Sequence, residues 1–94
     1  MEIEFDPEKN ERNIRVRGIP FTLAAKFDFS SALILEDKRQ NYGEARYQAI
    51  GYIESRLYVL VFTPRGEIMR VISLRKANRR EVKRYGRYIQ KSRP

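Results

Sequence analysis

Arginine and lysine gather in the last third of this chain, and they are the residues whose types and spacing best suit chemistry. The 94-residue sequence carries 20 Lys and Arg against 12 Asp and Glu. The segment from Arg65 onward holds 11 of the basic residues and 2 of the acidic ones, so its charge is +9 and that of the first 64 residues is −1. Such asymmetry concentrates positive potential at one end of a small domain, as expected for a polyanionic partner such as RNA, DNA or an acidic protein.

Most cations of this segment are candidate RNA contacts. They are Arg65, Arg70, Lys76, Arg79, Arg80, Lys83 and Arg84. A run of charges is more often a solvated helix face, but a strand that leads straight into a basic helix makes the two interpretations about equal. Lys76 stands at the predicted helix entrance, where free backbone N–H groups would add to an anion site.

Histidine and cysteine are both absent, and this narrows the possible chemistry. Without Cys there is no disulfide or zinc–thiolate site, and without His the commonest metal ligand and general base near neutral pH are missing. No Gly-rich phosphate loop or carboxylate cluster is present either. Any reaction must therefore use carboxylates, Lys, Arg or Tyr, and the sequence implies neither a metal nor a cofactor.

A strand and a helix should position the basic segment. Residues 67–74 form two alternating sets, both largely apolar, which predicts an interior strand. Asn78 and Glu81 have the spacing of a capping box, so a helix should begin near Arg79. One narrow arc of this helix holds Val82, Tyr85, Gly86 and Ile89, and the other side holds Arg80, Lys83, Arg84, Arg87 and Lys91. One face should therefore dock and the other should be cationic.

A helical hairpin is predicted near the N-terminus. Residues 2–5 alternate polar and apolar, as in a short edge strand. A helix over 7–17 should follow, with Asp6 as its N-cap and Gly18 in a left-handed cap at its end. It has few apolar residues and should lie on the surface. Residues 19–29 contain a pair of alanines and favour a second helix.

The remaining strands should build the sheet. Residues 32–35 are a short β run, 36–46 a polar loop, and 47–53 and 56–63 two strands, with a turn over 64–66 leading into the last strand. These close reversals predict an α+β fold with a twisted antiparallel sheet of about four strands and its helices on one face.

The chain should form a single domain over 1–94, with 89–94 as a flexible tail. Its acidic N-terminus is not a secretory signal and no stretch approaches transmembrane length, so we expect a cytoplasmic protein with no membrane partner.

Three stretches, FDPEKNERNIRVRGIPF, DKRQNYGEARY and RVISLRKANRREVKRY, together resemble the BrnT toxin family in their order and spacing. The resemblance covers residues 4–85. It implies a small bacterial ribonuclease toxin of a type II toxin–antitoxin system, with a RelE-like fold. It also implies neutralisation by a cognate DNA-binding antitoxin, BrnA.

The sequence departs from the family pattern at three positions. Phe5 stands where relatives usually have Trp, and Arg17 stands where a His usually precedes the glycine. Phe62 stands where relatives often carry His. If either histidine transfers protons in relatives, activity in this chain would be weaker or lost.

The resemblance also suggests catalytic residues. Cleavage of RNA without a metal needs a base for the 2′-OH, cations for the developing phosphate charge and an acid for the leaving oxygen. Arg46 and Arg75 match family positions and suit the phosphate, and Glu44 suits the base. Tyr85 could stack on a base or donate a proton, although core packing is the stronger interpretation. Lys9 could bind phosphate or be merely solvated.

We therefore expect a metal-independent endoribonuclease that acts on mRNA and is held inactive by a BrnA-like ribbon-helix-helix antitoxin. Because such antitoxins dimerise, a higher-order complex should form. Glu44 and Arg46 could equally form a structural ion pair. The alternative function is a non-catalytic RNA- or antitoxin-binding module of the same fold, and a DNA-binding role ranks last because no helix-turn-helix spacing is present.

Overall fold

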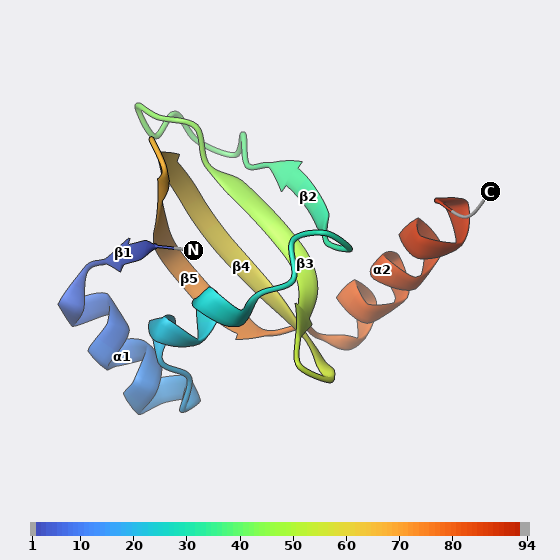
Figure 1. The fold of residues 1–94 in the computed structure, drawn as a ribbon, viewed down its shortest axis with the longest axis horizontal. Coiled ribbons are helices and arrows are strands. Elements are labelled where there is room, and N and C mark those ends of the chain that lie inside the picture. The colour runs from blue at the N-terminus through green and yellow to red at the C-terminus, as the bar shows by residue number, and fades with distance from the viewer. Residues whose placement is uncertain (1, 93–94) are drawn as a thin grey trace.

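The computed structural model describes residues 2–92 and is an α+β domain built on one sheet (Figure 1). The strands are β1 (Ile3–Phe5), β2 (Leu33–Glu36), β3 (Tyr47–Ile53), β4 (Arg56–Arg65) and β5 (Ile68–Lys76). The helices are α1 (Pro7–Arg17), the 3-10 helix η1 (Phe21–Lys26) and α2 (Arg79–Lys91). None of these helices is long and apolar enough to span a membrane.

The sheet has five strands in the order β1-β5-β4-β3-β2 and is mixed. β2 to β5 form the predicted antiparallel meander, whereas β1 pairs parallel to β5, with Ile3 opposite Met69. The prediction of about four antiparallel strands is therefore wrong. Between β1 and β5 the chain forms α1, η1 and three strands, and a long connection of this kind allows parallel pairing.

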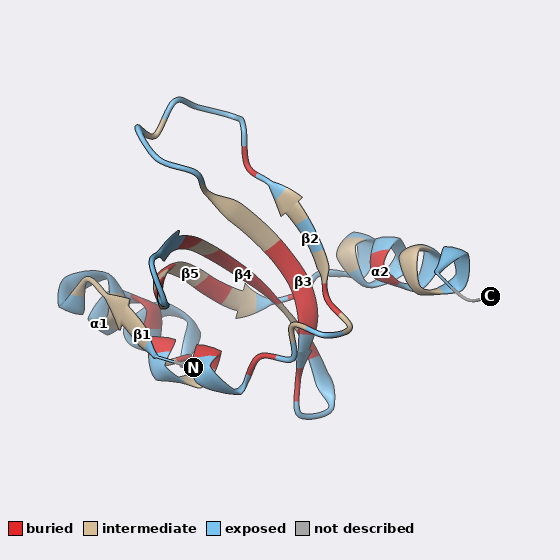
Figure 2. Ribbon diagram, turned by 45° about the horizontal axis from the view of Figure 1, so that its top comes forward, coloured by how far each residue is buried: buried red, intermediate tan, exposed pale blue. Residues whose placement is uncertain are grey.

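The helices cover both faces of the sheet, not one as predicted. Alternate residues of β4 point to opposite faces, so Leu60 packs in one hydrophobic cluster with η1 while Leu57 and Val59 pack in another with Tyr85 of α2. The central strands β3 and β4 are the elements richest in buried residues (Figure 2). The sheet therefore has an η1 face and an α2 face.

The predicted second helix is shorter and tighter than expected. The predicted range was 19–29, but the helix is 3-10 and η1 spans only six residues. Its buried side chains, Phe21 and Ala24, are followed by buried Phe27, and this spacing of three matches the 3-10 repeat. Phe27 then packs directly on Gly51, where an added Cβ would lie 2.6 Å from the ring.

β5 carries a bulge that decides which of its residues face α2. Val61 pairs with Ser73 and the next residue, Phe62, pairs with Val71, so one extra residue of β5 stands between them. Beyond the bulge the side chains exchange faces. Arg75, opposite Val59, therefore lies on the α2 face.

α1 is attached to the sheet through polar groups. Its predicted caps are present: the Asp6 side chain accepts a hydrogen bond from the backbone N–H of Glu8, and Gly18 has the left-handed conformation with φ 71°. Its apolar residues Ile14 and Val16 are exposed. Buried Asn13 instead donates through Nδ2 to the carbonyl oxygens of Ile19 at 2.9 Å and Leu74 at 2.8 Å.

α2 starts at Arg79, as predicted, with the capping box of Asn78 and Glu81 formed. Residues 89–91, predicted as part of a flexible tail, are the last helical residues. Positions 93 and 94 of that tail lie outside the described residues.

Candidate functional site

A row of polar side chains crosses the α2 face of the sheet at the end away from α2. Arg46 directly precedes β3, and the register of β3 on β4 places it beside Thr63. Thr63 pairs with Arg70 of β5, and Arg70 pairs with Glu4 of β1. We call these four residues the polar row.

Two buried polar atoms in this row have no hydrogen-bond partner among the described residues. They are Nε of Arg46 and Oγ1 of Thr63, and Thr63 is only 1% exposed. Buried polar atoms in proteins are nearly always hydrogen bonded, and an unsatisfied one costs about 1–3 kcal/mol. Arg46 and Thr63 are therefore the two positions of the row where a polar atom is buried without a compensating hydrogen bond.

Solvent-accessible ion pairs join members of the polar row to each other and to the neighbouring residues Glu44 and Arg65. Arg65 lies 3.4 Å from Glu44 and 3.6 Å from Glu4, and Arg70 lies 3.6 Å from the same Glu4 oxygen. Exposed pairs of this kind contribute about 0–1 kcal/mol, so an incoming phosphate could replace the carboxylates at little cost. Arg46, by contrast, forms no ion pair with any described carboxylate, Glu44 included.

The β2–β3 loop is folded around a buried carboxylate. The Asp37 side chain is 3% exposed and accepts hydrogen bonds from Arg39 Nε at 2.9 Å and from a terminal guanidinium nitrogen of Arg39 at 2.8 Å. These bonds hold the pKa of Asp37 well below its usual range. Tyr42 OH also donates to Asp37, at 3.2 Å.

The same loop carries Arg46 and forms a hollow of about 480 Å³ with Tyr42, Glu44 and Arg46 in its lining. The Arg46 guanidinium carbon lies 3.7 Å from the centre of the Tyr42 ring. Sequence reasoning missed Asp37, Tyr42 and Thr63 as site residues. The only available signal was that the first two belong to the quoted DKRQNYGEARY stretch.

Arg75 lies elsewhere on the α2 face, at the junction of β5 and α2. Two of its guanidinium nitrogens each lie 2.7 Å from an oxygen of Glu81, and Glu81 also accepts the backbone N–H of Asn78 at 2.8 Å. The Arg75 hydrogen bonds lower the pKa of Glu81 and raise that of Arg75. Val59, opposite Arg75, is four residues from Thr63, so Arg75 is about 13 Å along the strand from the polar row.

Tyr85 is buried on the inner side of α2. It is 5% exposed, its hydroxyl donates to the carbonyl oxygen of Ser31 at 2.8 Å, and its ring meets Tyr52 edge-on. The structure therefore places Tyr85 in a hydrophobic cluster and does not bring it to the polar row.

The cations of α2 divide into two sets. Arg80, Arg84 and Arg87 line a hollow of about 330 Å³ beside Glu81, and we call these three residues the basic flank. Arg79 instead lines a separate hollow with Tyr52 and Arg56 of the sheet, and Lys83 is exposed. Lys76, exposed at the end of β5, lies nearest to this helix in the chain.

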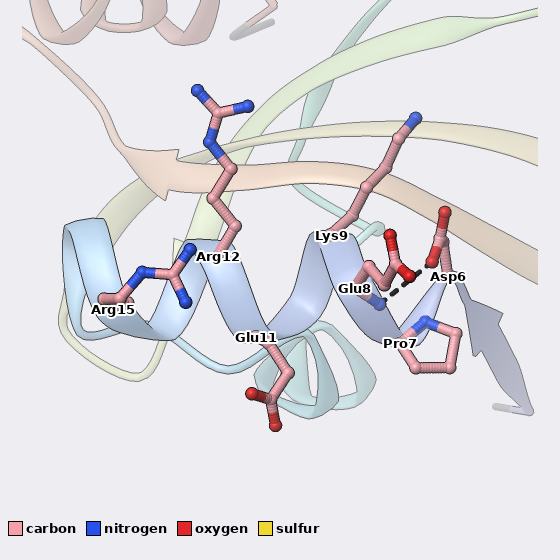
Figure 3. Close-up of a pocket in the computed structure, with 7 residues that line it drawn as sticks. All are labelled: Asp6, Pro7, Glu8, Lys9, Glu11, Arg12 and Arg15. Carbon is pink, nitrogen blue, oxygen red and sulfur yellow. Dashed lines mark hydrogen bonds between the residues drawn. The ribbon is translucent and has the colours of Figure 1, made fainter.

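Lys9 lies on α1, apart from the polar row and the basic flank. In Figure 3 it points to the same side of the helix as Arg12, whereas Glu11 points to the other side. These residues line an open hollow of about 790 Å³ along α1. α1 contacts the outer edge of β5, so this hollow is separate from the polar row.

The structure thus brings Arg46, Glu44, Arg65 and Arg70 to one end of the α2 face, while Arg75, Lys76 and the basic flank lie at the other end. No cluster of three or more acidic side chains that could hold a metal occurs within residues 2–92. The arrangement offers cations and hydrogen-bond donors for a polyanion.

Comparisons with known proteins agree with this chemistry. A family model described as the ribonuclease toxin BrnT of type II toxin–antitoxin systems matches residues 5–81. A comparison with curated proteins found no match. The matched range contains three of the four residues of the polar row, Arg46, Thr63 and Arg70, together with the β2–β3 loop and the junction of Arg75 with Glu81. The chain belongs to the BrnT family of ribonuclease toxins of type II toxin–antitoxin systems.

Proposed function

We propose that this protein is a metal-independent endoribonuclease that cleaves messenger RNA at the polar row. The observation that carries the proposal is Arg46. Its guanidinium has no carboxylate partner among the described residues, and its Nε is buried without a hydrogen-bond partner, as is Oγ1 of Thr63 on the neighbouring strand β4. Guanidinium groups bind phosphate through parallel N–H bonds, so we take the other N–H groups of Arg46 as the donors to an RNA phosphate.

In the proposed reaction the RNA 2′-OH attacks the adjacent phosphorus. A base removes the hydroxyl proton, the new O–P bond closes a 2′,3′-cyclic phosphate, and the 5′ oxygen leaves with a proton from an acid. Arg46 stabilises the added negative charge on the phosphate. Glu44 is the candidate base, and it must first leave its ion pair with Arg65.

Arg75 is a second candidate cation, but each of its terminal nitrogens already donates to Glu81. Its positive charge is therefore partly neutralised before RNA binds. Tyr85 is assigned to packing because its hydroxyl already donates to a backbone carbonyl.

A BrnA-like ribbon-helix-helix antitoxin is the proposed partner. An acidic segment of this antitoxin would neutralise the polar row and the basic flank, because both surfaces must be masked to exclude RNA. A complex larger than a heterodimer, a RelE-like relationship of the fold and a cytoplasmic location complete the proposal.

The second candidate function is a binding module without catalysis. Glu44 and Arg75 are both held in ion pairs, and the chain has no His. Phe62, where relatives often carry His, packs on the η1 face against Phe29 and therefore points away from the polar row.

The test compares Arg46→Ala with Arg56→Ala, a charge-matched change at an exposed position at the far end of β4. Cleavage of a short single-stranded RNA should fall about a hundredfold in Arg46→Ala, as for other lost transition-state donors, and hardly at all in the control. The free energy of unfolding of both variants should lie within about 1 kcal/mol of the wild-type value. EDTA should leave cleavage unchanged.

Equal rates for the two variants would contradict the site. Wild-type protein that binds RNA without ever cleaving it would favour the binding module.

A further inference from the structure

We infer that Asp37 and Tyr42 are positioning residues for Arg46: they hold its guanidinium in the orientation in which it meets an RNA phosphate. The inference rests on the proposed function, because it takes Arg46 to be the phosphate contact. It adds two residues of the β2–β3 loop that do not touch RNA themselves.

The first step is the contact between Tyr42 and Arg46. The Arg46 guanidinium carbon lies 3.7 Å from the ring centre, so the ring contacts the face of the guanidinium. A cation held over an aromatic face keeps its N–H edges available. Arg75 shows the alternative, since the carboxylate that orients it also occupies its donors.

The second step is the anchoring of Tyr42. Its hydroxyl donates to Asp37 Oδ2 at 3.2 Å, and the other contacts of that buried carboxylate come from Arg39. The backbone N–H of Asp37 also donates to the carbonyl oxygen of Arg46 at 2.7 Å. Asp37 therefore closes the loop at its base and fixes the ring on which Arg46 rests.

The third step concerns what this support achieves. A free arginine side chain has many rotamers, and fixing one of them on binding costs entropy. Because the loop fixes the guanidinium before RNA arrives, this cost is paid on folding. Loss of the ring should therefore lower the rate of cleavage through Arg46 alone.

The test is a double-mutant cycle that measures kcat and KM for a short single-stranded RNA. The variants are Tyr42→Leu, Tyr42→Phe, Arg46→Ala and the double variant Tyr42→Leu with Arg46→Ala. The control, Tyr52→Leu, removes a tyrosine of β3 that lies on the same face of the sheet as Arg46 but about 20 Å from it along the strand.

Tyr42→Leu should lower kcat/KM on the order of tenfold, mainly through kcat, while Tyr42→Phe stays within about threefold because it keeps the ring. In the Arg46→Ala background, Tyr42→Leu should cause no further loss. Asp37→Asn should fall between Tyr42→Phe and Tyr42→Leu.

Three results would overturn the inference. Tyr42→Leu could match the Tyr52→Leu control, it could cost the same factor with and without Arg46, or Tyr42→Phe could lose as much as Tyr42→Leu. If Arg46→Ala cleaves RNA at the wild-type rate, the proposed site itself fails. If Arg46→Ala is slow and Tyr42→Leu is not, only the positioning role fails.

Discussion

The two long helices of this protein are held to the same sheet by different forces. α1 presents Ile14 and Val16 to solvent, and its attachment is a buried Asn13 that donates to two backbone carbonyls. α2 packs Tyr85 and Ile89 into a hydrophobic cluster. One helix is attached by hydrogen bonds and the other mainly by apolar burial.

This difference explains why the sequence predicted how α2 docks but not how α1 is attached. An amphipathic arc is visible in a sequence because its apolar residues repeat with the helical period. A polar anchor has no such period, since a single Asn13 in a helix looks like any solvated residue. The carbonyl of Leu74 also needs this donor, because β1 pairs with β5 only over Met69 to Val71.

The largest loss of stability is expected from a change at the polar anchor of α1. Asn13→Ala should lower the free energy of unfolding by about 3 kcal/mol, because it leaves the buried carbonyls of Ile19 and Leu74 without a donor. Urea unfolding followed by circular dichroism measures the change. Val16→Ala, at a position 68% exposed on the same helix, is the control and should stay within about 0.5 kcal/mol. A loss below about 1 kcal/mol for Asn13→Ala would mean that other contacts hold α1.

A smaller effect is expected at the polar contact of α2. Tyr85→Phe keeps the ring in its cluster and removes only the hydrogen bond to the Ser31 carbonyl oxygen. The free energy of unfolding should therefore fall by about 1 kcal/mol. RNA cleavage should not change. The two measurements are urea unfolding and the cleavage rate of the purified protein. Unchanged stability with lost cleavage would return Tyr85 to the catalytic site.

The smallest effect on stability is expected at the basic flank of α2. Here the two helices should differ in RNA binding instead, with α2 contributing more than α1. Replacing Arg80 and Arg84 by Ala should change stability by less than about 1 kcal/mol but weaken RNA binding. The slope of log affinity against log salt should fall by about 1.4 if each arginine neutralises one phosphate of single-stranded RNA. The matched control replaces Arg12 and Arg15 of α1, which removes the same charge. Equal slopes for the two double variants would mean that the basic flank contacts no phosphate.

Local signals in the sequence determined several of the element boundaries of this protein. Asp6 and Gly18 were correctly predicted to bound α1, and the spacing of Asn78 and Glu81 gave the start of α2. The strand predicted over 47–53 also has the limits of β3. Caps and alternation depend on residues a few positions apart, so no long-range contact is needed to recognise them.

The sequence determined part of the candidate site as well. The resemblance selected Glu44, Arg46 and Arg75, and the charge pattern selected Arg65 and Arg70. Four of these five lie together at the polar row or beside it. Whether they act in catalysis remains a prediction.

Only the tertiary structure decided which cations are engaged and which are free. Arg46 and Arg75 look alike in the sequence, yet Glu81 accepts hydrogen bonds from both terminal guanidinium nitrogens of Arg75, while Arg46 has no described carboxylate partner and rests on the Tyr42 ring. The same holds for Thr63, which is an ordinary strand residue until burial removes it from water. Strand register, desolvation and the pairing of distant side chains arise from contacts between segments far apart in the chain, and a local pattern carries no information about them.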